Sequence, residues 1–211
     1  IIILAVKMLS DWLHLTTVGL LLEYVIMWGP LALIIIFQPE IRNILEHLGR
    51  RQILTKHRVL TMDEREKMIY EIMNAIEYLK KSRIGALIVV ERDVSLNDYI
   101  VRSKKVDADI SSDLLVSIFF PRNPLHDGGV IIRGNKIICA AAYYNLTQDP
   151  SLEKTTGSRH RAGVGISEIT DSLTIIVSEE TGDVHVTAAG FMNLMNNKNE
   201  LLDYIAIYLG N

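Results

Sequence analysis

TMDEREKMIYEIMNAIEYLKKSRIGALIVV, residues 61–90, contains the clearest signals of secondary structure in this chain. Thr61 and Glu64 form a capping-box pattern, which marks the start of a helix. Apolar residues then recur at helical spacing, at Ile69, Ile72, Met73, Ile76 and Leu79. Gly85–Val90 follows as a short and wholly apolar run, which is typical of a buried strand. The stretch therefore predicts a long amphipathic helix packed on a sheet.

Further strands and helices follow this pair. Gly134-Asn135 separates two apolar runs and predicts a hairpin turn. The other expected elements are helices over Ser111–Phe120, Arg159–Glu168 and Asn199–Leu209, and strands over Gly129–Arg133, Lys136–Ala142, Leu173–Ser178 and Val184–Thr187. Mixed strands and helices in this order indicate an α/β domain, with a central mixed β-sheet flanked by helices.

The N-terminal part of the chain has a different character. Val18–Gln38 is apolar with Glu23 as its only charge, and it is just long enough to cross a hydrocarbon core of about 30 Å. A buried core helix is the alternative. Ile1–Leu9 is a second apolar run, too short to span alone, and we expect it to belong to a longer membrane helix. Ser10–Thr17 would then be a turn on the outer face.

Basic residues follow the predicted span and favour the cytoplasmic side for what comes after it; they are Arg42, Arg50, Arg51, Lys56, His57 and Arg58. The sequence thus divides into transmembrane segments and an exit helix over residues 1–48, a basic linker over 49–60, and a cytoplasmic domain over 61–211. This organisation places N-terminal transmembrane helix segments before the α/β domain.

Composition excludes some classes of function. The net charge of −3 and the pI of about 6.1 do not suit a nucleic-acid surface, for which a domain pI above about 9 is expected. Cys139 is the only cysteine, so an internal disulfide is excluded and a reducing compartment fits. Its apolar surroundings in the sequence predict a small core residue.

The first candidate cluster is His126, Asp127, Gly128 and Gly129, which lies between a proline-bounded loop and a strand. A carboxylate there can bind Mg²⁺ or Mn²⁺, or accept a proton from a ribose hydroxyl. The glycines permit close approach of a ligand to the backbone. Taken alone, the pattern is equally that of an Asp-Gly turn beside a structural histidine.

The second cluster is Gly157, Ser158, Arg159, His160 and Arg161. Guanidinium groups bind phosphate through two parallel hydrogen bonds, and the start of a helix offers further N–H donors. Taken alone, this cluster could be a solvated surface patch. The two clusters together point to a metal-bound polyphosphate.

Two further pairs of neighbouring residues are candidates for a ligand-binding site. Glu179 and Glu180 close a predicted strand, and adjacent strand residues point to opposite faces, so we expect at most one of them to reach a given site. An exposed turn is the alternative. Tyr143 and Tyr144 follow the hairpin and could stack on a base or simply pack.

The segments LHDGGVII and GSRHRA resemble the D-G-A and R-H-R motifs of the diadenylate cyclases, and the similarity runs from about Trp12 to Ser178. The WGPLALIIIFQPE segment at 28–40 is similar to the membrane-bound CdaA type. The resemblance implies a bacterial multi-pass membrane protein that joins two ATP into cyclic di-AMP on a face-to-face homodimer. It also implies a YbbR-domain regulator and a phosphoglucosamine mutase as partners.

The resemblance assigns roles to individual residues. It implies catalytic roles for Asp127, Gly128, Gly129, Arg159, His160 and Arg161. It implies ATP binding by Leu125, Tyr143, Gly157, Ser158, Arg159 and Arg161, with the Tyr143 ring on adenine. It implies a divalent cation, Mn²⁺ or Mg²⁺ with Co²⁺ as a third candidate, held by His126, Asp127 and Glu180. Gly129 stands where the family usually has Ala, and Ser158 where Thr is common; we expect the missing methyl of Gly129 to loosen the backbone without removing a contact.

Two functions of other classes remain open from the sequence. One is a membrane-anchored nucleotide sensor without catalysis, which would bind nucleotide but release no pyrophosphate. The other is a structural membrane adaptor, in which both clusters are turns.

Overall fold

The structure is a computed structural model that describes residues 2–38, 41, 61–149, 152 and 157–210. The chain forms two compact units, one up to Gln52 and one from Ile53 onward. The predicted linker over 49–60, and nearly all of the predicted exit helix after Gln38, lie outside the described residues.

The first unit is a pair of helices, α1 (Ile2–Trp12) and α2 (Thr16–Ile36). Ser10 remains within α1, where its hydroxyl donates to the Leu15 carbonyl across 3.2 Å. The predicted turn over Ser10–Thr17 was therefore too long, because the helix continues two residues past Ser10 and α2 starts at Thr16.

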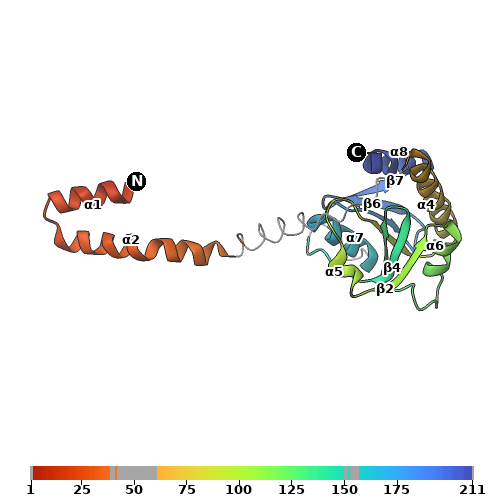
Figure 1. The fold of residues 1–211 in the computed structure, drawn as a ribbon, viewed down its shortest axis with the longest axis horizontal. Helices are drawn as coiled ribbons and strands as arrows, with labels where there is room; N and C mark the ends of the chain where they lie inside the picture. The colour runs from red at the N-terminus through yellow and green to blue at the C-terminus, as the bar shows by residue number, and fades with distance from the viewer. Residues whose placement is uncertain (1, 39–40, 42–60, 150–151, 153–156, 211) are drawn as a thin grey trace. The chain divides into compact units, whose positions relative to one another are not determined.

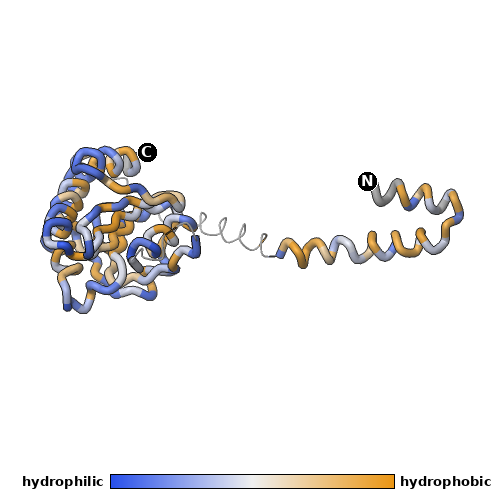
Figure 2. The backbone as a smooth tube through the Cα atoms, turned by 180° about the vertical axis from the view of Figure 1, so that it is seen from behind, coloured by the Kyte–Doolittle hydropathy of each residue, from blue (hydrophilic) through white to orange (hydrophobic). Residues whose placement is uncertain are grey.

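The helix α2 is the one helix in the described part of the chain that is long and apolar enough to cross a membrane, and Figure 2 shows its apolar character. None of its most apolar window is buried, which counts against the core-helix alternative. The 11 residues of α1 extend about 16 Å, too short for a span. The described residues therefore support one candidate membrane helix and do not support a multi-pass topology.

The second unit opens as the sequence predicts. The Thr61 hydroxyl accepts from the Glu64 N–H and the Glu64 carboxylate accepts from the Thr61 N–H, so the capping box forms. The helix α4 runs over Met62–Ser82 and ends at Arg83, whose φ of 51° breaks the helix. The strand β1 (Ala86–Val90) follows, and all five of its residues are buried.

The central sheet has seven strands in the order β2-β4-β3-β1-β5-β6-β7 (Figure 1). Only β1 and β3 pair in parallel, so the sheet is mixed, as predicted. The remaining strands are β2 (Lys104–Asp109), β3 (Gly129–Arg133), β4 (Lys136–Ala142), β5 (Leu173–Val177), β6 (Val184–Ala188) and β7 (Phe191–Met195).

Strand alternation divides the core between the two faces of the sheet. Ala86, Ile88 and Val90 point to one face, where they pack with α4, α6 (Ser112–Phe119) and α8 (Lys198–Gly210). Leu87 and Val89 point to the other face, which α5 (Asn97–Ile100) and α7 (Ser158–Ile169) cover. Figure 1 shows the sheet between these two groups of helices.

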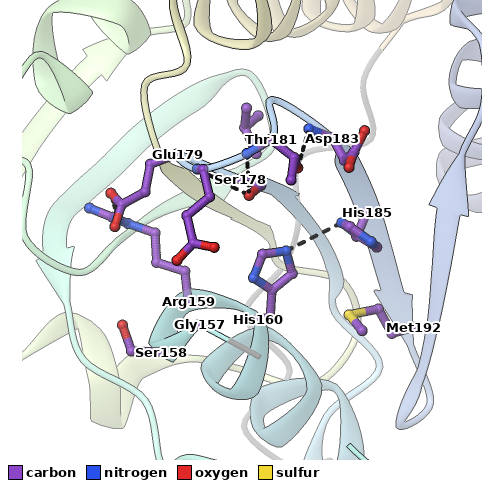
Figure 3. Close-up of a pocket in the computed structure, with 12 residues that line it drawn as sticks. Gly157, Ser158, Arg159, His160, Ser178, Glu179, Thr181, Asp183, His185 and Met192 are labelled. Carbon is purple, nitrogen blue, oxygen red and sulfur yellow. Dashed lines mark hydrogen bonds and ion pairs between the residues drawn. The ribbon is translucent and has the colours of Figure 1, made fainter. Parts of the chain in front are cut away.

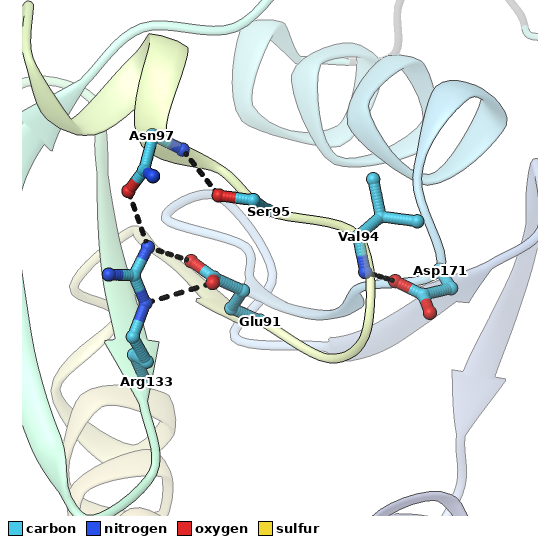
Figure 4. Close-up of polar contacts among 6 residues, drawn as sticks. All are labelled: Glu91, Val94, Ser95, Asn97, Arg133 and Asp171. Carbon is cyan, nitrogen blue, oxygen red and sulfur yellow. Dashed lines mark hydrogen bonds and ion pairs between the residues drawn. The ribbon is translucent and has the colours of Figure 1, made fainter. Parts of the chain in front are cut away.

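A buried ion pair joins two neighbouring parallel strands at their carboxyl ends. The Glu91 side chain is fully buried, and its carboxylate accepts two hydrogen bonds of 2.8 Å from Arg133 (Figure 4). Arg133 also donates to Asn97. On the same side of the domain, Asp171 accepts from the backbone N–H groups of Asp93 and Val94, and these contacts fix the segment that follows β1.

Candidate functional site

The N-terminus of α7 and the turn between β5 and β6 enclose a cavity of about 240 Å³. The cavity is lined by residues 157–160, residues 177–181, Asp183, His185 and Met192 (Figure 3). Three of the predicted site residues, Ser158, Arg159 and His160, come from the first turn of α7 and meet here. Glu180 meets them from the β5–β6 turn.

The first turn of α7 suits an anion. Gly157 caps the helix without a side-chain hydrogen bond, so the first N–H groups of the helix are available to a ligand. Arg159 lies beside them and donates from Nη1 to Glu179 Oε2 across 2.7 Å. Its buried Nε has no hydrogen-bond partner among the described residues. The cavity thus combines a helix N-terminus with a guanidinium group, which is a phosphate-binding arrangement.

Glu179 and Glu180 lie outside the strand in which the sequence analysis placed them. The strand β5 ends at Val177, and both carboxylates lie in a turn in which the Ser178 hydroxyl accepts from the N–H groups of Glu180 and Thr181. Both glutamates line the cavity. The prediction that at most one of them reaches a site was wrong, because it assumed that the strand continues through the pair.

His185 is a cavity residue that the sequence analysis missed. Its Nδ1 lies 3.2 Å from Nε2 of His160, with the two rings edge to face. Burial lowers the pKa of both imidazoles. A single histidine in a short strand gives no sequence signal, since its partner lies on a helix 25 residues away.

Arg161 lies elsewhere. Its Nη2 donates to the Thr147 carbonyl across 3.2 Å, and its own carbonyl accepts from the Thr147 N–H. Arg161 is not among the residues that line the cavity. These two hydrogen bonds join the segment after β4 to α7. Of the two predicted guanidinium groups, only that of Arg159 lies at the cavity.

The loop between α6 and β3 carries the other cluster. Asp127 is exposed, and its Oδ2 accepts a hydrogen bond of 2.8 Å from the Tyr143 hydroxyl at the end of β4. Gly128 has a φ of 103°, and a Cβ there would lie 2.7 Å from the Ala142 carbonyl oxygen. Only glycine fits this conformation, so Gly128 sets the direction of Asp127. Leu125 is half-buried and packs against the core from the same loop.

His126 has the features of a metal ligand. Its Nδ1 lies 2.6 Å from the Asn123 carbonyl oxygen, which can only accept, so Nδ1 carries the proton. The lone pair of Nε2 then remains for a cation, and a backbone carbonyl on the other ring nitrogen is a common support for a metal-binding histidine. Imidazole with carboxylate oxygens suits Mn²⁺, Mg²⁺ or Co²⁺.

The predicted metal ligands do not converge within one copy of the chain. In the part of the chain that the structure describes, no three His, Cys, Asp or Glu side chains form a group that could hold a metal ion. Neither His126, Asp127 nor Tyr143 lines the cavity that contains Glu180. The two clusters are therefore separate within one protomer.

The space at Gly129 is filled. A Cβ at this position would lie 2.8 Å from the Tyr144 ring and 3.1 Å from both Cγ and the carbonyl oxygen of Leu87. Tyr144 is buried and packs on Tyr99 with a centroid distance of 5.2 Å. Tyr144 and Leu87 therefore occupy the space that the methyl would take, and the looser backbone at Gly129 stays a prediction.

Residues 73–192 match the family model described as DAC, DisA bacterial checkpoint controller nucleotide-binding. The chain is 49% identical over 190 residues to the cyclic di-AMP synthase CdaA of Bacillus subtilis, covering 90% of this chain and 70% of that protein. It is 50% identical over 189 residues to a diadenylate cyclase of Listeria monocytogenes, covering 90% and 69%.

Solved structures agree with the fold. A double cysteine mutant of DacA from Staphylococcus aureus is 44% identical and superposes with a TM-score of 0.69, covering 72% of this chain and 100% of that one. A hypothetical membrane spanning protein from Bacillus cereus is 30% identical with a TM-score of 0.58, covering 90% and 96%.

Proposed function

Because this chain belongs to the diadenylate cyclase family, we propose that it joins two ATP molecules into cyclic di-AMP, with release of two pyrophosphates, at a site shared by two facing copies of the chain. Family membership makes the chain a diadenylate cyclase, a cyclic di-AMP synthase. The division of roles among its residues is our proposal.

The observation that carries the proposal is the separation of the two clusters. The anion cavity at the start of α7 contains Ser158 and Arg159, whereas Asp127 does not line it. A reaction that needs both a triphosphate site and a carboxylate at the attacking hydroxyl is therefore incomplete in one copy. Two copies related by a two-fold axis supply each element twice, as the formation of two equivalent bonds requires.

Each group then has a defined task. The triphosphate is bound by the N–H groups after Gly157, the Ser158 hydroxyl and the Arg159 guanidinium. The Tyr143 ring stacks on the adenine. Asp127 orients the ribose 3′-hydroxyl and accepts its proton. The hydroxyl oxygen forms a bond to the α-phosphorus of the ATP on the facing copy, and the bond from that phosphorus to pyrophosphate breaks.

A divalent cation fits the same site. Because these ligands form no group within the described residues of one copy, His126 and Asp127 of one copy and Glu180 of the facing copy would hold Mn²⁺, Mg²⁺ or Co²⁺ together with phosphate oxygens. Such a cation polarises a phosphoryl oxygen and stabilises the charge that develops there. The free Nε2 of His126 and the position of Glu180 in the cavity support this assignment.

We also propose the cellular setting. The basic residues that follow α2 in the sequence support a location of the catalytic domain on the cytoplasmic side of a bacterial membrane. The YbbR-domain regulator and the phosphoglucosamine mutase stay predictions from the family resemblance.

Dilution of the purified chain tests the shared site. If two copies form it, the specific rate of cyclic di-AMP formation falls as the protein is diluted below its dimerisation constant, and Asp127→Asn gives no product while its circular dichroism is unchanged. A specific rate independent of concentration down to a monomeric sample would overturn the shared site. ATP binding without pyrophosphate release in the undiluted wild type would favour the sensor.

A further inference from the structure

Two imidazoles in direct contact form one wall of the anion cavity. His160 Nε2, on the first turn of α7, and His185 Nδ1, in β6, are 3.2 Å apart, with ring centroids 4.8 Å apart and ring planes at 83°. Both residues line the cavity, and Figure 3 shows them facing each other beside the turn that carries the glutamates. A contact of this length between ring nitrogens needs one N–H and one lone pair.

The number of protons determines what the pair presents to a ligand. Two neutral imidazoles carry two N–H groups and two lone pairs, and the contact uses one of each. One N–H and one lone pair remain, on different rings. One added proton converts the remaining lone pair into a second donor and leaves the contact intact. A second added proton would place an N–H on both nitrogens of the contact, His160 Nε2 and His185 Nδ1, and the hydrogen bond between them would be lost. While the contact is intact, the pair therefore holds one positive charge at most.

The charges around the pair come from the first turn of α7 and from the turn between β5 and β6. Burial lowers the pKa of His160 below its ordinary 6.5, the neighbouring His185 and Arg159 lower it further, and Asp183 opposes them. Burial also lowers the pKa of His185, again against Asp183. Glu179 and Glu180 line the same cavity from the turn, and the β7 side of it contributes the uncharged Met192. Without a ligand, the pair is therefore neutral at neutral pH.

We propose that His160 and His185 act as one unit that donates to the oxygens of a bound polyphosphate and takes up a single proton when the polyphosphate binds. This inference rests on the proposed function, because it takes the cavity as the triphosphate and pyrophosphate site. An anion beside the pair favours its cationic form. The contribution of the pair to polyphosphate affinity therefore increases as the pH falls from the pKa of the occupied pair to that of the free pair, by at most about tenfold per pH unit, and this contribution is constant below that range.

Histidine NMR tests the proposal with inorganic pyrophosphate as the probe. The whole chain in detergent micelles, labelled at histidine Cε1 and kept metal-free with a chelator, is titrated with acid in the presence and absence of pyrophosphate. His160→Asn and His185→Asn assign the two signals. We expect both signals to follow one shared titration, whose midpoint pyrophosphate moves to higher pH.

Several outcomes would overturn the proposal. These are bound pyrophosphate with unchanged midpoints, a shift of the His160 signal alone, or no pyrophosphate binding. Cyclic di-AMP formation by the same sample, assayed separately with ATP and metal, decides the proposed function independently of these results.

Two variants of His185 separate ligand binding from a merely structural role. His185→Asn keeps a hydrogen-bonding group close to the position of Nδ1 but lacks the outer nitrogen, whereas His185→Phe keeps only the ring. We expect both variants to bind pyrophosphate several-fold more weakly than the wild type at pH 6. Full wild-type affinity in His185→Asn would show that His185 only holds His160 in place and would contradict the proposal.

Discussion

The hydroxyl of Tyr143 donates a hydrogen bond to Oδ2 of Asp127 across 2.8 Å. The carboxylate raises the pKa of the tyrosine, mainly through this hydrogen bond. Tyr143 directly follows the hairpin strand β4, whereas Asp127 precedes β3, so the pairing of these two strands brings the residues together. One contact thus links the ring proposed to carry adenine to the carboxylate proposed to receive the ribose proton.

Tyr143→Phe should separate these two roles. The variant keeps the aromatic face but loses the hydrogen bond that orients Asp127, so we expect kcat to fall by about threefold to tenfold with KM for ATP nearly unchanged. Tyr143→Leu removes the ring and should raise KM as well. Steady-state kinetics of cyclic di-AMP formation measures both values. A Tyr143→Phe enzyme with wild-type kcat would mean that Asp127 does not depend on the tyrosine.

The two arginines of the R-H-R segment should respond differently to the same substitution. Arg159→Lys loses the planar guanidinium group at the cavity, and we expect KM for ATP to rise by about tenfold. We expect little change in Tm, since the Glu179 side chain of its ion pair is 63% exposed and a lysine keeps the positive charge. Arg161→Lys weakens the contact with the Thr147 carbonyl. We therefore expect this variant to lower Tm and to leave KM for ATP nearly unchanged. Equal increases in KM would instead place Arg161 on the phosphates, as the family resemblance implies.

Gly129→Ala should destabilise this chain, although alanine is usual in the family. The added methyl meets the buried Tyr144 ring and the Leu87 carbonyl oxygen, and the backbone atom cannot move aside cheaply. Overpacking of this kind costs about 1–3 kcal/mol. Thermal unfolding followed by circular dichroism measures the change. An unaltered or higher Tm would show that the Tyr144 ring shifts to accept the methyl.

The buried pair of Glu91 and Arg133 gives a prediction on stability. Arg133→Met leaves the Glu91 carboxylate buried without its guanidinium partner, which costs about 3–5 kcal/mol of unfolding free energy. The double variant Glu91→Gln/Arg133→Met removes the charge and should recover part of that loss. Urea unfolding compares the three proteins. A double variant less stable than Arg133→Met alone would mean that the unpaired charge is not the main cost.

Local signals explain what was predictable from the sequence. The capping box at Thr61 and the turn at Gly134-Asn135 act within a few residues, and both the helix and the hairpin form where expected. The buried strand β1 was also predicted correctly, because a wholly apolar run suits the centre of a sheet. Cys139 is a buried core residue, as its apolar context indicated.

The missed elements depend on tertiary contacts. The strands β2 and β7 lie at the two edges of the sheet, where most side chains are not fully buried. The alternation of Val106 and Ala108 with two aspartates in β2 is short, and β7 shows no alternation. The short helix α5 was missed as well; it contains no buried residue. In the site, the end of β5 before Glu179 and the contact of His160 with His185 depend on how separate segments meet, which sequence spacing does not encode.

Mass spectrometry of the products formed from ATP by the purified whole chain, with and without Mn²⁺ or Mg²⁺, shows whether the chain makes cyclic di-AMP. We predict metal-dependent formation of cyclic di-AMP with two pyrophosphates released per product, and none from Asp127→Asn. A folded wild-type protein that binds ATP but yields neither cyclic di-AMP nor pyrophosphate with any of these cations would contradict the account.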